Sequence, residues 1–204
     1  MSLLRIIAGA PRESVPIFPL QTVLFPGALL PLRIFETRYM DMARACLRER
    51  SAFGVCLIRE GQEVGAPALP EPIGCLARIA DCDMEELGIL KLRAAGTERF
   101  RIVSSEVGRQ GLIVSEIERV AAEAPAPAAP GLQACALFLA KAIAGIGAER
   151  FAEPYAFDDA SWVGFRLAEL LPLRNDVKQR LLELTDAALR IAFLHRFLAQ
   201  QKLI

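Results

Sequence analysis

Hydrophobic and polar positions follow two different periods along the chain. Up to residue 120, apolar residues mostly alternate with polar ones, as in residues 89–93, which is the period of a strand with one buried face. After residue 130, apolar residues return at every third or fourth position, as in residues 132–143, which is typical of amphipathic helices. The pattern therefore predicts a sheet followed by helices.

A series of short strands is predicted in the first part. Many short strands joined by glycine, proline and acidic turns favour a small barrel or a strongly curved sheet. Pro16, Pro19 and Pro31 fall within the first two strands, and because proline lacks the ladder N–H, we expect these to be edge or bulged strands. The predicted strands are residues 15–20, 29–35, 51–60, 73–82, 88–96, 98–104 and 111–120.

One helix interrupts the predicted sheet. Thr37 is its expected N-cap, and an apolar stripe runs from Tyr39 to Leu47, with Arg38 on the opposite face. In the last part, caps and breakers delimit about four further helices. The last of them is apolar around much of its circumference, so it either packs among the other helices or pairs with another copy of the chain. The four helices are predicted at residues 132–146, 158–171, 175–184 and 185–202.

A composition shift separates the two parts. Residues 121–130, "AAEAPAPAAP", alternate alanine and proline, which favours an extended, semi-rigid spacer over helix or sheet. We therefore expect a β-rich part at residues 1–120, a linker at 121–130 and a helical subdomain at 131–204. The predicted fold class is α+β, mainly β in the N-terminal part.

Composition and charge narrow the functional classes. A chain of 204 residues is long enough to fold without disulfides or metals. Its 24 basic residues balance 24 acidic ones, so no overall field attracts nucleic acid or an anionic membrane. The five cysteines form no CxxC pair and predict reduced thiols in a cytoplasmic protein. Residues 1–13 hold too short an apolar run for a signal peptide, and we expect an extra strand or a loose arm there.

The sequence lacks the motifs that would mark an enzyme. It has no GxxxxGK[ST] loop, and the glycine pair in residues 145–150 follows a predicted helix, which indicates a helix end. The acidic run at residues 81–86 is interpreted as a solvated hairpin tip. The single histidine, His195, lies among apolar helix positions, and the scattered cysteines lack metal-ligand spacing. We predict no catalytic, cofactor-binding or metal site; an unrecognised enzyme using a cysteine or His195 in a cleft between the two parts remains an alternative.

Five short motifs in a particular order carry a family resemblance. They are "PIFPL" at 16–20, "LFPG" at 24–27, "FETRY" at 35–39, "IGCLARI" at 73–79 and "GTERF" at 96–100. In this order they resemble the N-terminal, substrate-binding domain of Lon proteases. The later helices are similar, less sharply, to the helical part that follows the sheet in that family.

The resemblance implies both a fold and a function. The implied fold is a PUA-like pseudobarrel with one inserted helix, followed by a helical subdomain. In Lon proteases this region engages protein substrates and supports oligomer assembly, and an ATPase and a Ser-Lys peptidase module follow it. Neither module is found in these 204 residues, so we expect a stand-alone relative rather than a protease.

The expected partners are unfolded or exposed protein segments, bound without catalysis by a protein that acts as an adaptor in protein quality control. Edge strands would accept a peptide by strand addition. A homo-oligomer is compatible with this reading, and no cofactor, nucleic acid or membrane is expected. RNA binding stays open as an alternative because PUA-like barrels elsewhere bind RNA, although the balanced charge argues against it.

The residues that carry the resemblance are expected to be mainly structural, with direct partner contact as the alternative. Pro26 and Gly27 fit the central positions of a type II turn. Phe35 and Tyr39 are expected to lock the helix onto the sheet, and Glu36 with Arg38 to fix that junction. The full set is Pro26, Gly27, Phe35, Glu36, Arg38, Tyr39, Gly74, Gly96, Arg99 and Phe100.

Overall fold

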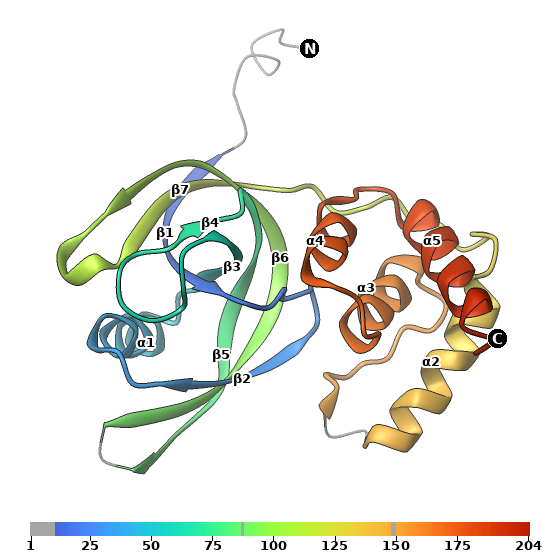
Figure 1. Cartoon of the computed structure of the whole chain (residues 1–204), viewed down its shortest axis with the longest axis horizontal. Coiled ribbons are helices and arrows are strands. Elements are labelled where there is room, and N and C mark those ends of the chain that lie inside the picture. Colours follow the sequence, from blue (N-terminus) through green and yellow to red (C-terminus); the bar gives the residue numbers. More distant parts are fainter. Residues whose placement is uncertain (1–10, 87, 148–149) are drawn as a thin grey trace, which may run out of the picture.

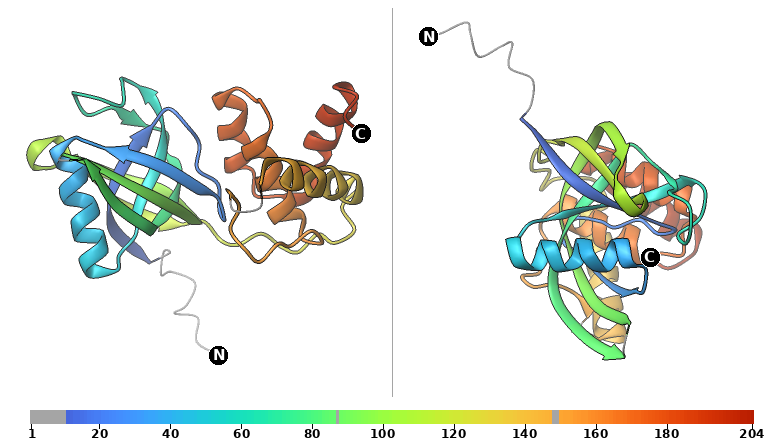
Figure 2. Two further views of the ribbon diagram at one scale, coloured as in Figure 1. Left: turned by 90° about the horizontal axis from the view of Figure 1, so that it is seen from below. Right: turned by 90° about the vertical axis from the view of Figure 1, so that its left-hand side faces the viewer.

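The protein has an α+β fold with the strands on one side and four helices on the other, as the predicted class requires (Figure 1). A second view shows the same separation (Figure 2). The computed structural model describes residues 11–86, 88–147 and 150–204. In chain order the elements are β1 (Arg12–Leu20), β2 (Leu29–Ile34), α1 (Thr37–Glu49), β3 (Phe53–Glu60), β4 (Leu69–Pro70), β5 (Ile73–Glu86), β6 (Ile89–Val107), η2 (Arg109–Gly111), β7 (Ile113–Arg119), α2 (Leu132–Ile146), α3 (Ala160–Leu170), α4 (Asn175–Glu183) and α5 (Ala187–Gln200).

Strand β1 closes the sheet into a barrel. The strands follow the order β1-β7-β6-β5-β3-β4, and β1 also pairs with β3. Residues 12–17 of β1 pair antiparallel with β7, whereas residues 17–20 pair parallel with β3. Each half of β1 therefore has a ladder on one side only. This arrangement accommodates Pro16 and Pro19, so the expectation of an edge or bulged strand at residues 15–20 holds for each half of β1, which has one open side, although β1 as a whole has a neighbour on both sides.

Strand β2 is an edge strand, as its proline predicts. Among the strands that the structure describes, it pairs only with β6. The turn before β2 is the predicted type II turn, because the Ala28 N–H donates to the Phe25 carbonyl at 3.0 Å and Gly27 has a φ of 75°. After this turn, the chain runs along the side of β6 that does not pair with β5.

Two predicted strands are in fact one. The segments 88–96 and 98–104 both belong to β6, because Gly96 continues the ladder instead of turning the chain. A side chain at Gly96 would place its Cβ 2.3 Å from the Phe25 carbonyl oxygen, so glycine serves close packing here. The acidic run at residues 81–86 is likewise part of β5, which continues to Glu86, and the hairpin tip follows it.

Helix α1 begins as predicted, with two local differences. Glu36 rather than Thr37 occupies the N-cap position, and no side-chain hydrogen bond caps the helix there. Arg38 does not lie on the solvent face but is buried, while Leu47, expected in the apolar stripe, is 44% exposed. The stripe shortens by one position because the helix packs on the barrel through Tyr39, Met42, Ala43 and Cys46.

The four C-terminal helices match the predicted ones. The Asp159 carboxylate caps α3 by accepting from the Ser161 N–H at 2.8 Å. Asp186, not Thr185, caps α5. Helix α5 packs against α3 and α2, which is the first of the two alternatives considered. Leu189 and Phe193 on α5 remain exposed, and pairing through them with another copy stays a prediction.

A hydrophobic core joins the barrel to the helices. Its largest cluster contains side chains of both parts, and the rings of Phe25 and Phe165 have centroids 5.8 Å apart. Residues 121–130 form no helix or strand, while the division into parts at 1–120 and 131–204 stays a prediction. The expected arm at residues 1–10 lies outside the described residues, and residues 12 and 13 belong to β1. Within the described ranges, no helix is long and apolar enough to cross a membrane.

The close approach at Gly96 yields a stability prediction. Gly96→Ala forces the Phe25 backbone to move and should lower the free energy of unfolding by about 1–3 kcal/mol. Gly145→Ala is the control, because Gly145 lies in α2 with open space around its Cβ position, and alanine there should be neutral or stabilising by up to about 1 kcal/mol. Urea unfolding of both variants measures the difference, and equal stabilities would show that Gly96 is not tightly packed.

Candidate functional site

Three residues of the "FETRY" motif, Glu36, Arg38 and Tyr39, form a cluster at the start of α1. Arg38 Nη2 lies 2.7 Å from the Glu36 carboxylate, and Arg38 Nη1 donates to the Gly111 carbonyl at 3.1 Å. The guanidinium also lies over the Tyr39 ring, 4.7 Å from its centroid, and that ring stacks on Phe18 at 4.1 Å. Burial raises the pKa of Tyr39. The cluster therefore joins α1, β1 and the β6–β7 turn, although the buried Arg38 Nε has no hydrogen-bond partner among the described residues.

Other motif residues divide between the core and the surface. Phe100 is fully buried, whereas Phe35 is 56% exposed and does not lock the helix onto the sheet as expected. Gly74 lies against Phe100, since a Cβ there would come within 2.8 Å of its ring. The Pro26 carbonyl accepts a hydrogen bond from the buried Arg166 at 2.7 Å. Phe35 is the large apolar motif side chain that this arrangement leaves exposed.

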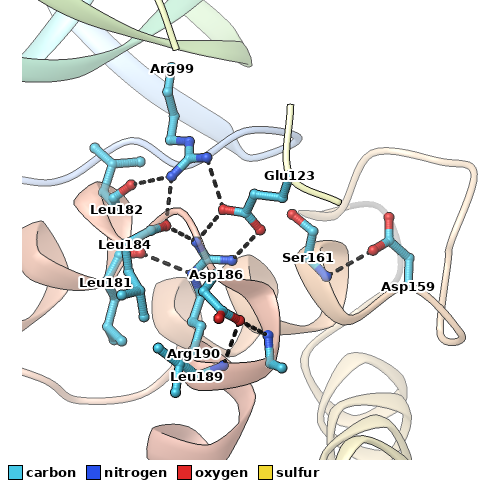
Figure 3. Close-up of polar contacts among 11 residues, drawn as sticks. Arg99, Glu123, Asp159, Ser161, Leu181, Leu182, Leu184, Asp186, Leu189 and Arg190 are labelled. Carbon is cyan, nitrogen blue, oxygen red and sulfur yellow. Dashed lines mark hydrogen bonds and ion pairs between the residues drawn. The ribbon is translucent and has the colours of Figure 1, made fainter. Parts of the chain in front are cut away.

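Arg99, the remaining motif residue, belongs to an ionic cluster between the barrel and the helices (Figure 3). Arg99 Nη2 lies 2.9 Å from the Glu123 carboxylate, and Arg190 Nη1 donates to the other oxygen of that carboxylate at 2.8 Å. All three side chains are almost completely buried. The two guanidinium groups also donate to the backbone carbonyls of Leu181, Leu182 and Leu184.

Glu123 is held ionised by this cluster. Burial opposes its charge, but hydrogen bonding and charge from Arg190, with contributions from Ser161 and Arg99, keep the pKa of its carboxyl below the ordinary value. Burial conversely lowers the pKa of Arg99. Because the carboxylate is shared by two guanidinium groups, it has no free lone pair directed at a substrate and acts as a structural counterion.

The cysteines are poorly suited to nucleophilic chemistry. Burial raises the pKa of Cys75 to about 12 and that of Cys135 to about 11. It raises the pKa of Cys46, Cys56 and Cys82 as well. Thiols in such surroundings stay protonated at neutral pH, and the thiolate is the reactive form. These observations weaken the alternative of a cysteine-dependent enzyme.

The open edge of β2 presents backbone groups in a regular order. Ala28 accepts from the Gly96 N–H at 2.9 Å, and the same register pairs Leu30 with Ala94 and Leu32 with Leu92. The backbone N–H and carbonyl groups of successive residues in a strand point to opposite sides. Those of Leu30, Leu32 and Ile34 therefore bond to β6, while the backbone groups of Pro31 and Arg33 point to the open side. The missing N–H of Pro31 thus falls on the open side, and Arg33 supplies an N–H and a carbonyl there.

Three hollows surround this edge, and Pro31 lines all of them. The first, of about 210 Å³, lies at the end of β2 nearest α1, where Phe35 and Val64 are exposed. The second, of about 460 Å³, lies between β2 and the helices and includes Leu29, Ile146, Phe151 and Leu170. The third, of about 560 Å³, includes Arg33, Asp81, Asp83, Lys91 and Arg93.

The edge was predictable from sequence, but the hollows were not. Pro31 within an apolar strand is a local signal for an edge. The contribution of Ile146 and Phe151 depends on how the helices dock, which no spacing in the sequence reveals. The charged cluster of Arg99, Glu123 and Arg190, described above, also joins segments that are distant in the sequence. Two sequence features could have indicated it: an acidic residue, Glu123, in an alanine–proline segment, and an arginine, Arg190, in an apolar helix.

Solved structures define the class of this fold. A crystal structure of a Lon N-terminal domain protein from Xanthomonas campestris matches with a TM-score of 0.74 and 38% identity, covering 89% of this chain and 96% of that one. The N-terminal domain of a Mycobacterium avium complex Lon protease matches with a TM-score of 0.66 and 20% identity over 89% of this chain and 96% of that one. The second likeness concerns the fold alone.

The family follows from the sequence match. The chain belongs to the ATP-dependent protease La (LON) substrate-binding domain family, which it matches over residues 14–200. A curated relative, protein cereblon of Xenopus tropicalis, is 26% identical over 110 residues, which are 52% of this chain and 24% of cereblon. The chain thus spans about a quarter of the length of that relative.

The ionic cluster predicts a large effect for one charge. Glu123→Gln leaves Arg99 and Arg190 buried without a counterion and should lower the free energy of unfolding by about 3–5 kcal/mol. Glu98→Gln is the matched control, because Glu98 pairs with Arg119 at an exposed site, where about 0–1 kcal/mol is expected. Chemical denaturation measures both, and a small effect of Glu123→Gln would contradict the assigned role.

The same carboxylate predicts a dependence on pH. Because the native pKa of Glu123 is lowered from 4.5, its contribution to stability is fully present above about pH 4.5 and is lost as the pH falls through the lower native value. The stability difference between the wild-type protein and Glu123→Gln should therefore shrink steadily below pH 4.5. Denaturation at a series of pH values tests this, and a constant difference would rule the linkage out.

Proposed function

We propose that the protein is a non-catalytic module that binds exposed segments of other proteins, and that such a segment docks as an added strand on β2. The observation that carries this proposal is an open strand edge with a hollow at each of its ends, lined by both apolar and polar side chains. Membership of a substrate-binding domain family supports it. In a cell the protein would serve as an adaptor in protein quality control.

Strand addition fits the dimensions of the edge. The six residues of β2 span about 20 Å at roughly 3.3 Å per residue. A segment of that length reaches from the hollow at Phe35 to the hollow at Phe151. Backbone hydrogen bonds would supply affinity that does not depend on sequence, while the hollows accept alternate side chains. This combination suits a protein that recognises many unfolded partners.

The edge also carries protection against uncontrolled pairing. Natural edge strands are commonly guarded by proline and by charged side chains, and β2 has Pro31 and Arg33 in outward positions. Pro31 removes one donor from the open side, so an added strand gains fewer hydrogen bonds than it would in a complete ladder. Binding is therefore expected to be weak and reversible, as release of a substrate requires.

The thiol chemistry supports the non-catalytic and cytoplasmic parts of the proposal. All five cysteines are unpaired and four are buried. Their raised pKa values keep them protonated, which leaves them unreactive, and free thiols are typical of reducing compartments. His195 contributes to packing, since its ring lies 2.7 Å from the Cβ position of Gly131.

The outward N–H of Arg33 allows a direct test. Arg33→Pro removes that N–H without removing a β2–β6 hydrogen bond, whereas Arg33→Gln keeps it and loses the same charge. Arg33→Pro should bind a labelled, permanently unfolded polypeptide about 2- to 12-fold more weakly than Arg33→Gln, since one hydrogen bond is worth about 0.5–1.5 kcal/mol. Fluorescence anisotropy measures the affinities, and thermal unfolding checks that both variants are folded.

Two results would count against the proposal in different ways. Equal binding by the proline and glutamine variants would show that the β2 edge is not the docking strand. An absence of binding by the wild-type protein, with several unfolded polypeptides at micromolar concentration, would remove the proposed function itself.

A further inference from the structure

The charges beside the β2 edge are arranged in an ordered gradient. Across the sheet, β5 contributes carboxylates, and the neighbouring strands β6 and β2 contribute cations. The register aligns Asp83 with Lys91 and Lys91 with Arg33 in one row across the three strands. A second row aligns Asp81 with Arg93 and then with Pro31. Positive charge therefore lies next to the open edge and negative charge lies away from it.

Arg33 ends the first row without a neutralising neighbour. Its cross-strand neighbour on β6 is Lys91, and like charges directly opposite each other are unfavourable. In the described ranges, Arg33 has no hydrogen bond or ion pair, and its side chain is exposed. The carboxylate in its row, Asp83, is two strands away, about 10 Å at the usual strand spacing. The position beyond Arg33 is the one that an added strand would fill.

Three carboxylates around the edge pair with arginines, and a fourth accepts a backbone N–H. Glu36 pairs with Arg38, and Glu63 accepts from the Gln21 N–H. Glu169 lies 3.2 Å from Arg166, and Asp81 lies 3.4 Å from Arg93. None of these contacts involves Arg33, whose guanidinium stays available to a carboxylate of a bound segment.

The inner face of β2 is apolar and sets the alternate positions. Leu30, Leu32 and Ile34 face the core or its margin, whereas Pro31 and Arg33 face outward and are exposed. In an added strand, the residues beside the leucines would lie over apolar surface, and the residue beside Arg33 would share its outward face. One face of an added strand would therefore favour apolar residues, and the other would favour a residue that can pair with Arg33.

We infer that the segments selected by the β2 edge alternate apolar residues with an acidic residue that pairs with Arg33. This inference rests on the proposed function and specifies its substrate class as extended acidic-apolar segments of protein chains. The acidic side chain of the bound segment extends the row of Asp83, Lys91 and Arg33. It gives Arg33 a counterion, which the described residues do not provide. A basic residue at the same position would add a third cation to Lys91 and Arg33.

A charge-swap experiment tests the pairing. Three labelled peptides share an alternating apolar sequence and differ only in a central Glu, Gln or Lys. The wild-type protein should bind the Glu peptide about two- to five-fold more tightly than the Gln peptide and should bind the Lys peptide most weakly, which is the scale of an exposed ion pair. The preference should decrease between 50 mM and 500 mM salt because exposed pairs are screened.

Matched variants of the protein assign the preference to one residue. Arg33→Glu should reverse the order, so that the Lys peptide binds best. Arg109→Glu makes the same change in net charge at an exposed position of η2 and should keep the wild-type order. Thermal unfolding verifies that both variants are folded, and Arg33→Gln, which should abolish the preference without reversing it, provides a second, milder substitution.

Each outcome has one meaning. Equal binding of the three peptides, or a reversal caused by Arg109→Glu as well, would overturn the pairing while the proposed function stands. Failure of all peptides and of the unfolded polypeptide would remove the proposed function. Displacement of the Glu peptide by a short RNA at equal concentration would assign the cations to phosphate instead and would also overturn the inference.

Discussion

The arrangement of the molecule depends on one buried carboxylate. Glu123 lies between the guanidinium groups of Arg99 and Arg190 and so links the barrel, the connecting segment and the last helices. A charge in such surroundings is tolerated only when its partners are held in place. The two arginines in turn donate to carbonyls at the end of α4. Loss of one member would leave the others costly to bury, so the cluster favours a single docking of the two parts.

This docking gives the edge of β2 its surroundings. The barrel alone would offer an open strand with the hollow near α1 and the hollow lined by β2, β5 and β6. Because the helices are held beside the barrel, Phe151 and Leu170 come to lie next to Leu29, and the edge gains a third hollow at its other end. Under the proposed function, the ionic cluster would therefore act on binding at a distance, through the position of the helical part and without contact to a partner.

The sequence predicted elements better than it predicted contacts. Prolines, glycines and apolar periods act locally, so the turn at Gly27, the edge at Pro31 and the four last helices were all recognisable. Arg38 was misplaced because helical spacing alone put it opposite the stripe, whereas its length lets it reach the Gly111 carbonyl. The union of two predicted strands in β6 was missed because Gly96 resembles a turn residue, and only the neighbouring Phe25 backbone explains it.

Along β2, even-numbered residues direct their backbone groups to β6, and odd-numbered residues direct theirs to the open edge. Even-numbered residues bond to β6 and cover the core, so selection for folding acts on them. Of the odd-numbered residues, Leu29 is half-buried, whereas Pro31 and Arg33 are exposed on the face that an added strand would share. If partners dock on β2 as proposed, exchange of Pro31 and Arg33 would change specificity while the even-numbered residues preserve the scaffold. Under that proposal, recognition and the stability of the fold would depend on different residues of the same strand.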